Sequence, residues 1–378
     1  MTGQSVKIKL PFRVRRPMIA FGADTKGAFA IAKGADAVLV GPFGDLANPD
    51  NLAGYEEAIS AYRKRFKIRQ EVFACDLHPG YFSSSVATAY TLYAIRYPLL
   101  RIQHHEAHVA SVMAENAVRG NCIGVAFDGT GYGSDGNIWG GEFFTFGTRG
   151  FRRAGHLEYI AMPGGQAAVR EPWRMAVSWL YRSFGKHFVS FRMDLIKSLD
   201  KKKIAMLRQM IDKKINSPLT SSMGRLFDAA SSLILNKKDA ISEAALPIEL
   251  ESIASYQCED KYGYDLKVKN GIISVDAAGI ITGIVKDLAA RRISSSVISA
   301  KFHNTVADMV VKVSMRLRKS ANTDRVVLSG GVFSNKILLR RTRSILQGAG
   351  FTVYTSLNNL TGDVGIPLGQ IAIGEAIV

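Results

Sequence analysis

The chain has 378 residues, 47% of them hydrophobic and 21% charged, which is typical of a globular protein with one large or two medium domains. Its three cysteines, Cys75, Cys122 and Cys258, lie far apart and form no CxxC pair, which argues against a disulfide framework or a cysteine zinc site. No apolar run is long enough to cross a bilayer, and the basic N-terminus lacks the apolar core of a signal peptide. We therefore expect a cytoplasmic protein without a membrane partner.

The formal net charge of +17 makes nucleic-acid binding one interpretation of the composition. The basic residues are scattered, however, with small groups at 13–16, 201–203, 316–319 and 340–343 and no interleaved aromatic residues. We expect a solvated basic surface and no nucleic-acid partner. Attraction to an acidic protein or to an anionic nucleotide remains a third interpretation.

The first part of the chain predicts a sheet followed by alternating helices and strands. Residues 1–16 are expected to form a loose basic lead-in. Glycine turns divide the next apolar segments into three predicted strands in a meander, at 18–24, 28–32 and 37–40. The later predicted elements are a helix over 52–66, a strand over 71–75, a helix over 84–97, a strand over 97–102 and a helix to about 115.

The same plan starts again at Asn121. The predicted elements are a strand at 122–128, a loop at 129–136, strands at 138–146, 324–329 and 351–355, and helices at 335–347 and 367–378. A long helical insertion, about 150–320, interrupts this second copy. The repeated order predicts an α/β protein with the two-lobed actin-like and sugar-kinase (ASKHA) fold, whose lobes are duplicated ribonuclease-H-like units at 17–118 and 119–378.

Three of the seven histidines fall in the segment 101–111. His104 and His108 are four residues apart, so a helix would present both imidazoles on one face. Two imidazoles make half of a site for zinc or iron. The apolar segment before them reads as a strand, and open α/β sheets bind ligands at the carboxyl ends of strands. A solvated helix with a chance histidine pair is the alternative.

Two acidic residues are candidates to complete such a site. Asp128 ends a predicted strand, and Asp363 lies between the last predicted strand and helix. Two histidines and two carboxylates would suit iron(II) or zinc, although a strand-end aspartate is as often a turn or helix-capping residue. The turn at Gly330 and Gly331 precedes a predicted helix, so its N–H groups could hold a phosphate.

Motifs along almost the whole chain resemble the carbamoyltransferase (TsaD-like) portion of the hydrogenase maturation family HypF. They include Phe21-Gly-Ala-Asp-Thr-Lys26, Cys75-Asp-Leu-His-Pro79, Gln103-His-His-Glu-Ala-His108, Phe127-Asp-Gly-Thr-Gly-Tyr-Gly133, Gly224-Arg-Leu-Phe-Asp-Ala229 and Leu328-Ser-Gly-Gly-Val-Phe333. The resemblance implies transfer of a carbamoyl group from carbamoyl-adenylate to the C-terminal cysteine thiol of a HypE-like acceptor, for synthesis of the cyanide ligand of [NiFe] hydrogenase.

The resemblance also implies site residues. A metal, iron(II) or zinc, would be held by His104, His108, Asp128 and Asp363. An adenine nucleotide (carbamoyl-adenylate, ATP or AMP) would be held by Gly224, Asp228, Gly330, Gly331 and Asn335. The candidate catalytic residues are Lys26, which would contact a phosphate or the carbamoyl oxygen, and Asp24. His105 would either orient a ligand or be packed.

The chain also departs from the family. The family's upstream acylphosphatase, zinc-finger and YrdC-like domains are not in it, so a YrdC-like carbamoyl-activating protein would have to act in trans. Three motifs differ, at Gln166, Glu243 and Val364. These differences keep two alternatives open: a related carbamoyltransferase with a small-molecule or tRNA acceptor, and a non-catalytic nucleotide-binding paralogue.

Overall fold

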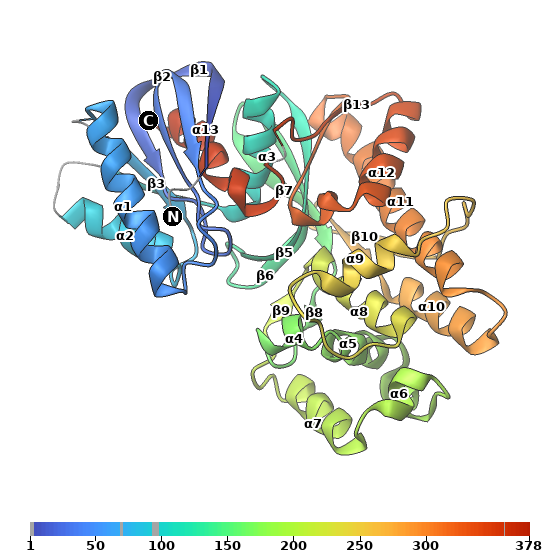
Figure 1. Ribbon diagram of the computed structural model, residues 1–378. Coiled ribbons are helices and arrows are strands. Elements are labelled where there is room, and N and C mark those ends of the chain that lie inside the picture. Colours follow the sequence, from blue (N-terminus) through green and yellow to red (C-terminus); the bar gives the residue numbers. More distant parts are fainter. Residues whose placement is uncertain (1–3, 69–70, 93–97, 359) are drawn as a thin grey trace.

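The computed structural model describes residues 4–68, 71–92, 98–358 and 360–378. Over these residues it is a mixed α/β structure with two sheets, one in each half of the molecule (Figure 1). The first sheet has the order β2-β1-β3-β4, and the second runs β10-β11-β7-β6-β5-β12-β13, with β8 and β9 beside β6. No described helix combines the length and apolar character needed to cross a membrane.

The first half contains β1 (Ser5–Ala20), β2 (Phe29–Val40), α1 (Pro49–Phe66), β3 (Val72–Asp76), α2 (Phe82–Leu92), β4 (Leu99–Ile102) and α3 (His104–Glu115). The predicted helices α1 and α3 are confirmed. The prediction for α2 extended to residue 97, and residues 93–97 lie outside the described residues.

The basic lead-in was a wrong prediction, because residues 5–16 belong to β1, which pairs with β2 in antiparallel register. Ile8, Leu10 and Val14 are buried while the basic residues between them are exposed. This alternation is the period of a strand with one buried face. The predicted three-strand meander is also wrong, because the structure has two long strands there. Gly34 (φ +63°) lies at an irregularity within β2, opposite Val14, and not at a turn between two strands.

The second half contains β5 (Cys122–Tyr132), β6 (Ile138–Gly147), β7 (Gly150–Leu157), β8 (Ile160–Ala161), β9 (Leu219–Thr220), β10 (Asp265–Lys269), β11 (Ile272–Asp276), β12 (Arg325–Ser329) and β13 (Thr352–Tyr354). The predicted loop at 129–136 is wrong in its first half, since β5 continues to pair with β6 as far as Tyr132. The insertion is not only helical: β7, β10 and β11 extend the second sheet.

Among the described residues, ten helices follow α3 in the chain, and the last of them, α13, packs on the first sheet. They are α4 (Ala167–Arg170), α5 (Trp173–Phe184), α6 (Asp194–Ser198), α7 (Lys201–Asp212), α8 (Met223–Leu235), α9 (Ala245–Ser252), α10 (Ala278–Ala290), α11 (Ser295–Ala321), α12 (Lys336–Gly348) and α13 (Ile366–Ile377). Short 3-10 turns are η1 (Gly185–Ser190), η2 (Gly331–Ser334) and η3 (Gly362–Gly365). The apolar stripe of α11, including Phe302 and Val306, is buried as predicted.

Helix α3 lies between the two sheets and joins their cores. Its residues Ala107 and Ala114 pack with the first sheet, and Val109 and Val112 pack with the second. The final helix, α13, returns to the first sheet, although its residues fall within the range 119–378 predicted for the second lobe. Gly369 of α13 lies so close to α3 that a Cβ there would be 1.8 Å from the backbone oxygen of Ala107. The two helices therefore hold the histidine segment rigidly between the sheets.

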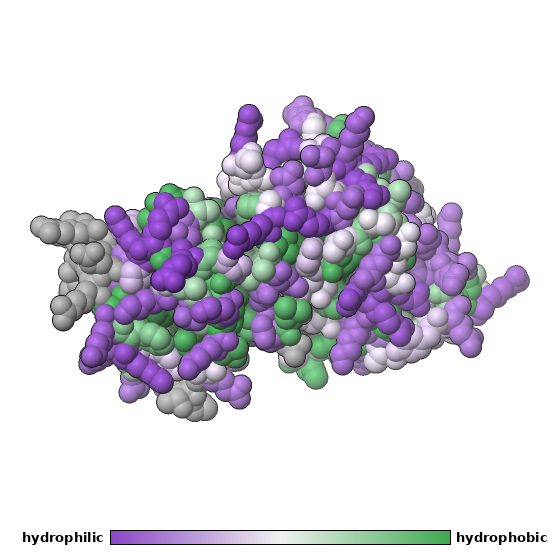
Figure 2. Space-filling model, turned by 90° about the horizontal axis from the view of Figure 1, so that it is seen from above, coloured by the Kyte–Doolittle hydropathy of each residue, from purple (hydrophilic) through white to green (hydrophobic). Residues whose placement is uncertain are grey.

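Hydrophilic side chains dominate the face seen in Figure 2, and hydrophobic ones occur there in small groups. Lys201, Lys202 and Lys203 are exposed on α7, as expected for a solvated helix face.

Candidate metal centre and adjoining cavity

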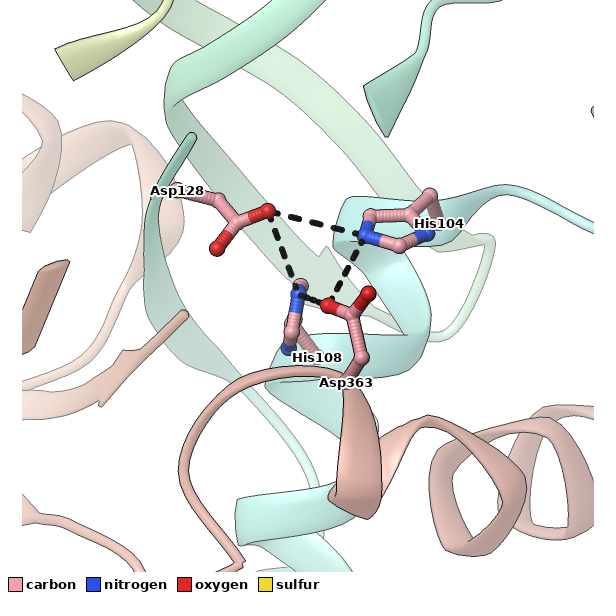
Figure 3. A group of neighbouring side chains, drawn as sticks. All are labelled: His104, His108, Asp128 and Asp363. Atoms are coloured by element: carbon pink, nitrogen blue, oxygen red, sulfur yellow. Dashed lines mark ion pairs between the residues drawn. The ribbon is translucent and has the colours of Figure 1, made fainter. Parts of the chain in front are cut away.

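Four side chains from three parts of the chain converge between the sheets (Figure 3). His104 and His108 extend from one face of α3, Asp128 from β5 and Asp363 from η3. Each imidazole Nε2 lies 3.7 or 3.8 Å from Asp128 Oδ2 and 3.7 Å from Asp363 Oδ1. One ligand atom from each of the four residues falls within 4.8 Å of the others. The structure thus brings together the four residues predicted as metal ligands.

The geometry and the unsatisfied nitrogens fit a bound cation. The Nε2 atoms of His104 and His108 are buried and have no hydrogen-bond partner among the described residues, and N···O separations of 3.7–3.8 Å are too long for hydrogen bonds. They slightly exceed the edge of about 3.4 Å that a tetrahedron has around an ion with bonds of about 2.1 Å. Two imidazoles and two carboxylates suit iron(II) or zinc, so the donor set fits the metal that the resemblance implies.

Asp76, which the sequence analysis did not assign, orients one of the histidines. Its Oδ2 accepts a hydrogen bond from His104 Nδ1 at 2.7 Å, and both side chains are fully buried. A carboxylate only accepts, so Nδ1 carries the proton and Nε2 presents its lone pair to the ligand set. The role of Asp76 follows from the order of the strands. Because β3 and β4 are parallel neighbours, Asp76 at the end of β3 lies beside the residues that follow β4.

The pKa values of Asp128, Asp363 and His104 are shifted in different directions. Burial would raise the pKa of Asp128, but the imidazoles of His104 and His108 outweigh it and hold that pKa well below its usual value. Burial raises the pKa of Asp363, and the charge of Asp128 adds to this effect. Burial would lower the pKa of His104, but the adjacent Asp76 carboxylate raises it well above the ordinary value. Metal ligands must be neutral imidazoles and ionised carboxylates, so a cation would displace protons from this set.

The third histidine of the motif, His105, does not join the set. Its ring is fully buried and lies 6.1 Å from the Trp139 ring. A Cβ on Gly131 would be 2.4 Å from it, so the glycine permits this close packing. Burial lowers the pKa of His105 well below its ordinary value. His105 is therefore a packed, neutral histidine, one of the two interpretations open from the sequence.

A cavity of about 890 Å³ adjoins the four residues and is lined by Asp128 and Asp363 themselves. Five more residues predicted for the site line it: Lys26, Gly224, Asp228, Gly331 and Asn335. Arg225, Tyr256, Lys336 and Arg340 also line it and were missed as site residues, whereas Glu243, one of the positions at which the motifs differ from the family, lines it too. Arg225 lies inside the motif that contains Gly224 and Asp228.

Two predicted residues, Asp24 and Gly330, are not among those that line the cavity. The Asp24 carboxylate accepts hydrogen bonds from the backbone N–H groups of Phe82 (2.7 Å) and Ser83 (2.9 Å) at the start of α2. It therefore caps a helix, which is the alternative role of a strand-end aspartate. Gly330 (φ +94°) allows close approach to β5, because a Cβ there would be 2.2 Å from the backbone oxygen of Phe127.

The helix start expected to hold a phosphate is already occupied by acceptors from the chain. Glu251 of α9 accepts hydrogen bonds from the N–H groups of Lys336 (2.7 Å) and Ile337 (3.2 Å). The N–H of Gly331 donates to Asp128 Oδ1 at 2.9 Å. Asn335 accepts from the Leu338 N–H at 2.8 Å and so caps α12.

The side-chain amide nitrogen of Asn335 also has a partner, the ring of His303. Asn335 Nδ2 lies 2.9 Å from His303 Nε2, and His303 Nδ1 lies 2.8 Å from the backbone oxygen of Ser299. Since a carbonyl only accepts, Nδ1 carries the proton and Nε2 accepts from Asn335. Burial lowers the pKa of His303 to about 4, so the ring is neutral.

The inner wall of the cavity combines one cation with two carboxylates. Arg225 Nε lies 2.8 Å from Asp228 Oδ2, and both side chains are 3% exposed. Burial raises the pKa of Asp228 to about 6; Arg225 opposes this shift and Glu243 adds to it. Glu243 is thus close enough to place a further negative charge on this wall.

Comparison with protein families shows which class of protein has this fold and this His–Asp centre beside a cavity: a Kae1-like domain. Residues 13–115 match the family model described as HypF Kae1-like domain, and residues 124–370 match the model for Carbamoyltransferase, Kae1-like Domain, second subdomain. The chain belongs to this HypF carbamoyltransferase family, as the sequence motifs predicted.

Individual relatives agree with the family match. Carbamoyltransferase HypF of Synechocystis sp. is 31% identical over 96% of this chain and 48% of its own length. A Carbamoyltransferase HypF homolog of Cupriavidus necator is 29% identical over 94% of this chain and 90% of its own length. The chain therefore spans about half of the first relative and most of the second.

Two crystal structures have the same fold over 98% of this chain. Full-length HypF in a phosphate- and nucleotide-bound form has a TM-score of 0.91 and 36% identity, and this chain covers 48% of it. HypF of T. kodakarensis has a TM-score of 0.86 and 26% identity, with 49% covered.

Proposed function

We propose that the protein transfers the carbamoyl group of carbamoyl-adenylate to the C-terminal cysteine thiol of a HypE-like acceptor. The observation that carries this proposal is that Asp128 and Asp363 belong to both the candidate metal centre and the wall of the cavity. A substrate in the cavity would therefore lie beside the metal ligands. The nucleotide-bound state of a solved relative supports a nucleotide as the cavity's ligand, and the motif resemblance implies an adenine nucleotide.

A bound iron(II) or zinc ion would supply Lewis-acid polarisation of the carbamoyl carbonyl or the phosphate. The acceptor thiolate attacks the carbamoyl carbon, a C–S bond forms, and the C–O bond to the phosphate breaks, so that AMP leaves as an anion and the thiol proton is released. The nucleophile belongs to the acceptor. This agrees with Cys75 and Cys122, which are buried thiols whose pKa values burial raises to about 11 and about 12.

The chain's own residues bind and orient the substrate. Lys26 is exposed at the cavity wall, and its side chain takes part in no hydrogen bond or ion pair found among the described residues, so its ammonium group is free to meet a phosphate. Lys336 and Arg340 add positive charge to the same cavity. Gly224, where a Cβ would be 2.7 Å from the Cα of Gly129, allows α8 to approach β5, so its part in nucleotide binding is to shape the wall.

The architecture suits this role. We assign the two halves to the lobes of an actin-like fold, predicted at 17–118 and 119–378, with β1 extending the first lobe back to Ser5 and α13 packed on the first sheet. We propose carbamoyl-adenylate made by a YrdC-like activity as the substrate, since the matched family models describe the carbamoyl-transfer region.

The proposal is tested first by metal content per chain after anaerobic purification, comparing the wild type with His104→Ala. His187→Ala, at an exposed histidine in η1, is the matched control. About one ion per chain in the wild type and the control, and none in His104→Ala, is expected for a four-ligand site. No ion in the wild type, even after reconstitution, would favour the non-catalytic paralogue.

The acceptor is tested next with ATP, carbamoyl phosphate, a YrdC-like activator and a HypE-like protein. Intact-mass analysis is expected to show one carbamoyl group on the acceptor, and none when its C-terminal cysteine is replaced. A persistently unmodified cysteine with an active, metal-loaded protein would reject this acceptor. Carbamoyl transfer to a small hydroxyl compound or to tRNA in the same mixture would identify the alternative.

A further inference from the structure

Asp128 contacts both halves of the site. Its Oδ2 faces the imidazoles of His104 and His108, at 3.7 and 3.8 Å. Its Oδ1 accepts the N–H of Gly331, which lines the cavity. Its backbone oxygen accepts a hydrogen bond of 2.8 Å from the hydroxyl of Ser222. The position of this carboxylate therefore depends on the cavity wall.

Ser222 is the residue that joins this strand to α8. It is buried and is the N-cap of α8, where its Oγ accepts from the Arg225 N–H at 3.2 Å. Its hydroxyl also lies 2.6 Å from the backbone oxygen of Gly129, so the proton is shared between two adjacent carbonyls of β5. Helix α8 carries Gly224 and Asp228, which line the cavity.

The backbone is closely packed around this junction. A Cβ on Gly140 would be 2.6 Å from the Asp128 backbone oxygen and 3.1 Å from the Ser222 Cα. A Cβ on Gly224 would be 2.7 Å from the Gly129 Cα. Close-packed contacts of this kind transmit a displacement rather than absorb it. A shift of α8 therefore shifts the Asp128 backbone.

We infer that Ser222 is a positioning residue that couples nucleotide binding in the cavity to metal binding at His104, His108, Asp128 and Asp363. The inference rests on the proposed nucleotide site. A ligand that fixes α8 also fixes the Asp128 carboxylate through the Ser222 hydroxyl, and a metal that fixes Asp128 fixes α8. By thermodynamic linkage, each ligand strengthens the binding of the other by the same factor.

Ser329 supports another of the candidate metal-binding residues and so serves as a control for Ser222. Ser329 Oγ donates to the backbone oxygen of His108 at 2.7 Å and is also buried. Ser329 thus supports a metal ligand with the same chemistry, but it ends β12 and is not among the residues that line the cavity. Ser329→Ala should weaken metal binding without changing the coupling.

The experiment measures the Kd of adenosine and of AMP by titration calorimetry on zinc-loaded and metal-free protein. Adenosine has no phosphate that could touch the ion, so any effect of zinc on it passes through the protein. In the wild type, zinc is expected to tighten adenosine binding by about fivefold or more, the lower end of typical allosteric coupling. In Ser222→Ala the ratio of the adenosine Kd without zinc to the adenosine Kd with zinc is expected to fall to near unity.

Two further variants separate coupling from helix capping. Ser222→Thr retains a hydroxyl and should retain the ratio. Ser294→Ala removes the N-cap of α11, where Ser294 accepts from the Val297 N–H, and should leave the ratio unchanged. Circular dichroism and zinc stoichiometry show that each variant is folded and loaded.

Three results would overturn the inference. Adenosine binding that is indifferent to zinc in the wild type, with both ligands bound, would refute the coupling and leave the proposed function intact. A zinc effect that persists in Ser222→Ala would assign the coupling to another path. Failure of zinc-loaded wild type to bind either adenosine or AMP would reject the inference and the proposed nucleotide site together.

Discussion

The strongest test of the metal centre is a change at Asp76, which contacts no substrate. Its carboxylate accepts from His104 Nδ1 at 2.7 Å and from the His78 backbone N–H at 2.8 Å. In Asp76→Asn the side chain has one oxygen, so only one of these buried donors can be satisfied. An unsatisfied buried donor costs about 1–3 kcal/mol, and outer partners of metal-binding histidines typically contribute about 10- to 100-fold in affinity. We expect zinc affinity to fall by about 10- to 100-fold, or roughly 1.4–2.7 kcal/mol.

Competition with a chromogenic chelator gives the zinc Kd of each protein. Glu71→Gln is the matched control: Glu71 is a buried carboxylate paired with Arg63 at 2.9 Å, just before the opposite end of β3. It should lower stability while leaving zinc affinity unchanged. Equal zinc Kd values for the wild type and a folded Asp76→Asn would refute the argument that Asp76 orients His104 for metal binding.

Three further predictions concern Gly330, His303 and Asn335, of which Asn335 lines the cavity. Gly330→Ala should destabilise the protein by more than about 2 kcal/mol in urea unfolding, because the strain at φ +94° is joined by a clash with the backbone oxygen of Phe127. The control Gly136→Ala, at φ +78° with open space around the new Cβ, should cost about 1 kcal/mol. Equal losses of stability in the two variants would contradict the predicted clash. His303 has a folded-state pKa of about 4, below the unfolded value of about 6.5, so its contribution of up to roughly 3 kcal/mol is present above pH 6.5 and lost as the pH falls through 4. Urea titrations should show a smaller acid loss of stability in His303→Gln than in the wild type, and parallel pH curves would refute it. Asn335→Ala removes the cap of α12 and should cost about 1–2 kcal/mol; a change in nucleotide Kd without this loss would instead restore Asn335 as a direct ligand.

Local patterns in the sequence predicted the helix that carries the histidine pair and the strand that contains Asp128, and placed Asp363 between the last strand and the last helix. His104 and His108 lie one turn apart on any helix, so their common face follows from spacing alone. The motif resemblance then identified all four members of the set, and the family match confirms that resemblance. The prediction of a loose lead-in missed β1, because the basic residues of 5–16 dominate its composition. Ile8 and Leu10 alternate with lysines there, which is the pattern of a strand with one buried face.

The roles of the acidic residues were decided only by tertiary structure. Asp24, Asp76 and Asp128 each end a predicted apolar strand segment or follow it directly, so the sequence presents them as nearly equivalent, although β5 in fact continues past Asp128. The neighbour that the fold brings to each one separates them. Asp24 meets the start of α2 and caps it, Asp76 accepts from His104 Nδ1, and Asp128 lies beside the other ring nitrogen of that imidazole, Nε2. A carboxylate's function depends on which donors lie within about 3 Å of it, and for residues far apart in the chain that distance is set by packing between the sheets, which local sequence does not encode.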